Sequence, residues 1–139
     1  MSAEQNRAAL DAAIAAWNRG DEETYLKLYD PSVRHHGVGP EPVDQAGNRA
    51  FYESVWAAFP GSQITIDDTV AEGDQLAVRF RLTGEHQGEF MGVPPTGRAF
   101  VLNGQTVVRF RDGRVVERWT TSDILGLLIQ LGAVPAPGA

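Results

Sequence analysis

The chain has 139 residues, no cysteine and a formal net charge of −6, with 12 Lys and Arg against 18 Asp and Glu. This length favours one domain over residues 1–139, and the lack of Cys excludes disulfides, thiolate metal sites and Cys nucleophiles. The acidic balance disfavours nucleic-acid binding, no run reaches the roughly 18 apolar residues of a membrane span, and the N-terminus lacks signal-peptide order, so we expect a soluble, cytoplasmic protein.

The N-terminal part of the chain predicts helices. Residues 4–19 carry Leu10, Ile14 and Trp17 at the four-then-three spacing of one helical face, on an Ala-rich background. Gly20 is a typical stop, because Gly adopts the left-handed conformation after a helix freely. Further helices are expected over residues 22–29, 48–59 and 124–131, and strands over residues 33–37, 63–70, 75–83, 100–111 and 114–121.

The sequence around Asp112-Gly113 predicts a β-hairpin, since two β-favouring runs flank a dipeptide that suits a tight turn. A two-residue turn would place Gln105, Arg109, Arg118 and Thr120 on one face, and Thr106, Glu117, Trp119 and Thr121 on the other. A one-residue bulge would exchange part of these two sets. Both faces carry apolar residues, so we expect helices to cover one face and a second subunit the other.

The order of elements, helices first and then an antiparallel meander, indicates an α+β fold. We expect the helices to pack on one face of a strongly curved sheet, leaving a blind internal cavity for small apolar molecules. The long loop over residues 84–98 is a candidate functional segment, with Phe90 and Met91 as the best lid candidates. The tail over residues 135–139 is expected to be disordered.

Several short segments, spread in order over nearly the whole chain, resemble the SnoaL-like polyketide cyclase family. They are WNRGD (residues 17–21), HG (36–37), AFP (58–60), EGD (72–74), TG (83–84), FMGVPPTG (90–97), DGRVVERW (112–119) and DILGLLIQLG (123–132). The resemblance implies a cone-shaped α+β barrel related to ketosteroid isomerase, homodimers through the sheet, and neither a metal nor an organic cofactor. It also implies an intramolecular aldol cyclisation of an aromatic polyketide ester, with an Asp as acid/base.

The chain departs from this family at the last strand. Many relatives read Glu-His-Trp-Asp where this chain reads Glu117-Arg118-Trp119-Thr120. A Thr hydroxyl does not titrate near neutral pH and cannot act as the base. The next carboxylate is Asp123, and which of positions 120 and 123 corresponds to the family's catalytic Asp stays open.

Asp123 therefore has two interpretations. It can be the N-cap of the last helix, accepting a backbone N–H. Alternatively it is the general base at the cavity floor, which requires a pKa raised by burial.

The histidines are further candidates. His35 and His36 are adjacent on a strand, so their side chains point to opposite faces and a shared metal site is not expected. The family resemblance favours His36 as the inward residue and a second catalytic candidate. His86, in the long loop, is either a substrate contact or a surface residue.

The predicted hairpin supplies polar binding candidates. Arg109 and Arg118 would share one face, where an acidic side chain or a substrate anion must lie between them. Gln105 and Thr120 would lie opposite each other and hold a substrate carbonyl. Most of the large aromatic and Met side chains are expected in the core, and two or three of them should line the cavity; the candidates are Trp17, Tyr25, Trp56, Phe59, Phe90, Met91 and Trp119.

We therefore expect a cofactor-free enzyme that acts on a small hydrophobic polyketide-like ester or ketone by acid/base chemistry at a carbonyl. A hydroxylase- or hydratase-type relative that has lost the aldol base is the second hypothesis. A non-catalytic dimer that binds a small apolar ligand is the third, and Thr120 is the feature that favours it.

Overall fold

The computed structural model describes residues 2–138, so Ala139, the end of the predicted disordered tail, lies outside the described part. The elements are α1 (Ala3–Asn18), α2 (Glu22–Leu26), β1 (Tyr29–His36), α3 (Gln45–Ala58), β2 (Gln63–Glu72), β3 (Gln75–Glu85), β4 (Ala99–Arg111), β5 (Arg114–Ser122) and α4 (Ile124–Gln130). Residues 135–138 contain neither helix nor strand.

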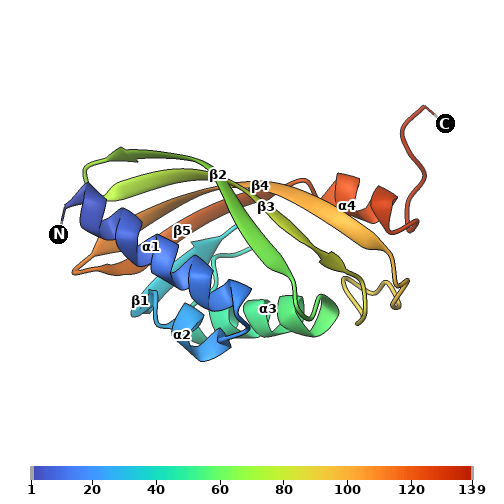
Figure 1. Ribbon diagram of the computed structural model, residues 1–139, viewed down its shortest axis with the longest axis horizontal. Helices are drawn as coiled ribbons and strands as arrows, with labels where there is room; N and C mark the ends of the chain where they lie inside the picture. The colour runs from blue at the N-terminus through green and yellow to red at the C-terminus, as the bar shows by residue number, and fades with distance from the viewer. Residues whose placement is uncertain (1, 139) are drawn as a thin grey trace.

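One curved, unclosed sheet organises the molecule, with strand order β1-β5-β4-β3-β2. Strands β2 to β5 pair antiparallel with their sequence neighbours, as the predicted meander requires. Strand β1 lies beside β5 and runs parallel to it, which the sequence pattern did not predict. The sheet arches over α1, α2 and α3, while α4 lies at the far end of the molecule (Figure 1). The α+β architecture is therefore confirmed.

The helices begin where the sequence offers capping side chains. Ser2 and Gln5 form a capping box at α1, and the Asp44 side chain accepts the backbone N–H of Gly47 at the start of α3. The end of α1 is fixed to the sheet, because the Asn18 side chain bonds both backbone groups of Ile64 at 2.7 and 2.9 Å. No helix within residues 2–138 is long and apolar enough to cross a membrane.

The chain between α2 and β1 differs from its prediction. Tyr29 was expected to end the second helix, whereas α2 ends at Leu26 and Tyr29 opens β1. Pairing with Val115 of β5 takes this residue into the sheet. The tertiary contact overrides a weak local helix preference.

The β4–β5 hairpin contains the bulge that the sequence left open. The pairing runs from Arg111 with Arg114 to Phe110 with Val115, and then shifts by one residue, so that Arg109 pairs with Glu117. Beyond this shift, β5 presents the other set of side chains to the helices. The inner residues are thus Thr106 and Val108 of β4 with Arg118 and Thr120 of β5.

Candidate active site

A cavity of about 780 Å³ lies between the curved sheet and the helices. Most of its lining is apolar, and it comes from α1, α3, the sheet and the long loop. The apolar residues include Trp17, Phe51, Val55, Phe59, Ile64, Phe80, Leu82, Phe90, Leu102 and Ile124. This volume falls in the range of about 300–1,000 Å³ that small-molecule sites occupy.

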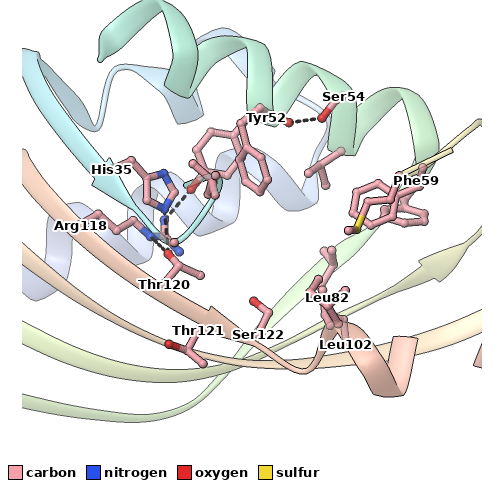
Figure 2. A pocket seen from close by; sticks show the side chains of 18 of the residues that line it. His35, Tyr52, Ser54, Phe59, Leu82, Leu102, Arg118, Thr120, Thr121 and Ser122 are labelled. Carbon is pink, nitrogen blue, oxygen red and sulfur yellow. Dashed lines mark hydrogen bonds between the residues drawn. The ribbon is translucent and has the colours of Figure 1, made fainter. Parts of the chain in front are cut away.

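A cluster of four polar side chains lies at one end of this cavity. His35, Arg118, Thr120 and Tyr52 lie together there, while Phe59, Leu82 and Leu102 lie at the other end (Figure 2). A ligand in the cavity would thus meet this polar cluster at one end and mainly apolar surface along the rest of its length, where the other polar lining residues are Ser54, Glu89, Thr121 and Ser122.

Arg118 is the centre of the polar end. Its Nη1 donates to the hydroxyls of Tyr25, Tyr29 and Tyr52 at 3.2, 2.6 and 2.8 Å. Its Nε donates to the hydroxyls of Thr106 and Thr120 at 2.9 and 3.2 Å. The guanidinium stays protonated in any protein environment, so the site holds a permanent positive charge.

His35 links Thr120 to helix α3. Its Nδ1 lies 2.9 Å from Oδ1 of Asn48, and its Nε2 lies 2.8 Å from Oγ1 of Thr120. The carbonyl oxygen of Asn48 only accepts, so Nδ1 carries the proton and Nε2 accepts the hydrogen bond of Thr120. The three side chains therefore form one ordered chain in which Thr120 donates to a neutral imidazole.

Because they are buried, the side chains of His35 and Tyr52 do not change protonation state near neutral pH. Burial and then the charge of Arg118 lower the pKa of His35 to about 3. Burial also raises the pKa of the Tyr52 hydroxyl well above its usual value. At pH 7 the imidazole and the phenol are both neutral, and Arg118 carries the only charge among these polar side chains.

The long loop covers part of the opposite end. Its base is fixed, because the backbone N–H groups of Gln87 and Gly88 both donate to the carbonyl of Ala58. Its tip turns at Met91 and Gly92, where both φ angles are positive, and the exposed side chain of Met91 lines the cavity. A fixed base with an exposed tip is suited to a lid.

Six of the candidate residues singled out from the sequence line the cavity, and Phe90 is one of them. The other five are Trp17, Phe59, Met91, Arg118 and Thr120.

Both catalytic candidates from the sequence lie elsewhere. His36 points to the outer face, where its Nε2 lies 2.7 Å from Glu117 and its ring stacks on Trp119, so the inward residue is His35. Asp123 is exposed and accepts the N–H of Gly126 at 2.9 Å as the N-cap of α4. The prediction of a buried base at position 123 is wrong, and its alternative, the helix cap, is confirmed.

The β5 bulge moves three binding candidates to the outer face. Gln105 is exposed and pairs with Thr121 instead of Thr120, and Trp119 lies on the same outer side. Arg109 does not share a face with Arg118, and it forms an ion pair of 3.0 Å with Glu117.

His86 is also absent from the cavity lining. It is fully buried at the base of the long loop, where its Nδ1 accepts the N–H of Thr96. We therefore assign it to the anchoring of this loop.

Sequence reasoning missed His35, Asn48 and Tyr52. A signal for His35 was present, since it lies two residues after the buried Val33 and must share its side of β1. No local pattern points to Asn48 or Tyr52, because their role depends on how α3 packs against β1 and β5.

Comparison with known proteins identifies the family of this chain. The family model of the SnoaL-like polyketide cyclases matches residues 7–131. The nogalonic acid methyl ester cyclase of Streptomyces nogalater is 27% identical over 86% of this chain and 91% of its own length. The aklanonic acid methyl ester cyclase DnrD of Streptomyces peucetius is 24% identical over 86% of this chain and 85% of its own.

Two solved structures extend the comparison. AclR of Streptomyces galilaeus, a proposed hydroxylase, superposes with a TM-score of 0.89 at 36% identity, over 97% of this chain and 85% of its own. IdmH of Streptomyces antibioticus, a proposed polyketide cyclase, gives a TM-score of 0.80 at 38% identity, over 92% of this chain and 99% of its own. The chain belongs to the SnoaL-like polyketide cyclase family.

Proposed function

We propose that this protein is an enzyme of the polyketide cyclase type, acting on a hydrophobic aromatic ketone or ester by acid/base chemistry at a carbonyl. The observation that carries the proposal is a largely apolar cavity with one polar end, where Arg118, Thr120 and His35 are joined by hydrogen bonds. The cyclase relatives are named for the methyl esters of nogalonic and aklanonic acid, and a methyl ester carries no charge that a largely apolar cavity would exclude.

The proposed reaction uses Thr120 as a proton relay. A C–H bond next to the substrate carbonyl breaks, and its proton passes to Thr120 Oγ1 as the hydroxyl proton moves to His35 Nε2. The resulting enolate carbon attacks a second carbonyl carbon and forms the new C–C bond. The proton then returns by the same route to the alkoxide, so no proton is gained or lost overall.

Arg118 supplies the electrostatic part of this mechanism. A proton on His35 is unfavourable in the free protein, since burial and Arg118 both oppose it. The negative enolate oxygen beside the guanidinium offsets that repulsion, which makes proton transfer favourable only when the enolate forms. A hydrogen between two carbonyl groups is acidic enough for such a weak base, so a 1,3-dicarbonyl substrate is expected.

The experiment is a cyclisation assay with purified protein and the methyl esters of nogalonic and aklanonic acid, followed by chromatography and mass spectrometry. We expect a product of unchanged mass and changed retention time. Failure to convert either ester or simpler aryl 1,3-diketones, with the folded protein at high concentration, would contradict the proposal.

A hydroxylase is the second candidate function. It is favoured by the likeness to AclR and by the absence of a carboxylate within hydrogen-bond reach of Arg118 or Thr120 in the described residues. The same mass spectrometry separates the two functions, because hydroxylation adds one oxygen atom and cyclisation adds none.

A further inference from the structure

Arg118 is a buried cation without an acidic partner. Its exposed fraction is 9%, and within residues 2–138 every group that it contacts by hydrogen bond is a neutral hydroxyl. The neighbouring Glu117 points to the outer face, where it bonds His36 and Arg109. A chain with 18 acidic residues thus places none beside its most buried arginine. A buried charge in this state is costly unless another group compensates it.

One nitrogen of this guanidinium remains available. Nε and Nη1 make all the hydrogen bonds of Arg118, and Nη2 makes none within the described residues. Nη2 is not fully buried, and Arg118 lines the cavity. Its N–H groups are therefore accessible from the cavity, where they can donate to a ligand oxygen.

The tyrosines add a second donor at the same place. Two hydrogen bonds, of 2.7 and 2.8 Å, join the hydroxyls of Tyr25, Tyr29 and Tyr52 in a row. The three hydroxyls carry three protons, and only two of these are used in the two hydrogen bonds within the row, so one proton remains free to be donated elsewhere. Tyr52 is the member of this row that lines the cavity, and its hydroxyl can turn the spare proton toward a bound anion.

From these observations we infer that the cavity selects ligands with an anionic oxygen, a carboxylate or an ionised enol or phenol, on an apolar ring system. Arg118 Nη2 and the Tyr52 hydroxyl bind that oxygen, and the apolar end of the cavity holds the rings. This inference rests on the proposed function only in placing the substrate in the same cavity. It adds that the donors proposed to stabilise the enolate also favour a ligand that arrives with an anionic oxygen over a neutral ligand of the same shape.

The test compares ligands of equal shape and different charge on the wild-type protein. Naphthoate, naphthamide and methyl naphthoate are titrated at pH 7, and binding is followed by calorimetry and by tryptophan fluorescence, to which Trp17 in the cavity lining contributes. We expect naphthoate to bind about 10- to 100-fold more tightly than naphthamide, since hydrogen bonds to charged groups are the stronger ones. This preference should persist in high salt, because a buried pair is screened little.

Two variants locate the effect. Arg118→Gln should abolish the preference for naphthoate, whereas Arg109→Gln removes the same charge from the outer face and should keep it. Because the wild-type ligand pair decides the question by itself, a variant that fails to fold does not prevent the test. Equal or tighter binding of naphthamide, no saturable binding of naphthoate, or a preference that survives Arg118→Gln would overturn the inference.

These outcomes are separable from the proposed function, since binding is measured without turnover. A protein that prefers naphthoate and cyclises nothing refutes the cyclase proposal and leaves the anion site standing. A protein that cyclises esters but binds naphthamide and naphthoate equally tightly refutes the anion site and leaves the cyclase proposal standing.

Discussion

Thr120 occupies the position where the sequence departs most clearly from the cyclase pattern, and its hydroxyl meets both His35 and Arg118. If it relays the proton, Thr120→Val should reduce kcat by about 10²- to 10⁴-fold, because Val keeps the shape and loses the hydroxyl. Thr120→Ser, the matched control, should retain most of the activity. Equal rates for the Val and Ser variants would remove Thr120 from the mechanism.

His35 gives the protein a pH-dependent stability. Its folded pKa of about 3 lies below the ordinary value of 6.5, so between these values the unfolded chain binds a proton that the folded chain does not. The free energy of unfolding should therefore fall as the pH drops through this window, by about 1.4 kcal/mol per pH unit, and stay unaffected above it.

Urea unfolding of the wild type and of His35→Gln at pH 7, 6, 5 and 4 isolates this effect, because the carboxylates titrate alike in both proteins. The variant should lose less stability on acidification than the wild type. Parallel curves would show that His35 does not titrate in this way.

At the scale of the elements, β1 and β5 must lie close enough for His35 to reach Thr120. Gly37, just after β1, has φ +95°, and a Cβ there would overlap the backbone oxygen of Thr120. Gly20 has φ +79° with open space around it, so it carries the same backbone strain without the clash.

We predict that Gly20→Ala costs about 1–2 kcal/mol of stability through strain alone. Gly37→Ala should cost about 1–3 kcal/mol more, because overpacking adds to the strain, and it should also lower activity by displacing Thr120. Thermal or urea unfolding of both variants checks this. Equal losses would mean that the two strands are not packed as closely as described.

Most helices and strands could be predicted from the sequence, whereas the register of the β4–β5 hairpin could not. Helices and strands were predictable because their signals are local: the spacing of Leu10, Ile14 and Trp17, and the turn at Asp112-Gly113. The β5 bulge has no comparable signal, yet it decides whether Gln105 or Thr106 lies across from Thr120. The cavity therefore followed from the order of elements, whereas of its polar cluster the sequence predicted Arg118 and Thr120 but not His35 or Tyr52.

At the scale of the whole molecule, the outer face of the sheet remains uncovered. It carries a groove lined in part by Val70, Ala77, Val107 and Trp119, with Val70 69% and Trp119 36% exposed. We propose that a second copy of the chain covers this face, since uncovered apolar sheet surface is a frequent interface.

Light scattering after gel filtration should then give the mass of two chains. Val107→Lys, which places a charge in the groove, should yield the monomer, whereas Ala12→Lys on the exposed side of α1 should not. A wild-type protein that is monomeric at tens of micromolar would refute this proposal.

In the proposed mechanism, the polar end of the cavity moves a proton to and from a substrate carbon. Deuterium exchange tests it most directly: an aryl 1,3-ketoester is incubated with the protein in D₂O, and label next to the carbonyl is followed by NMR. We expect exchange that is faster with wild-type protein than without it, and that is lost in Thr120→Val. Saturable binding of the ketoester without any acceleration of exchange would contradict it.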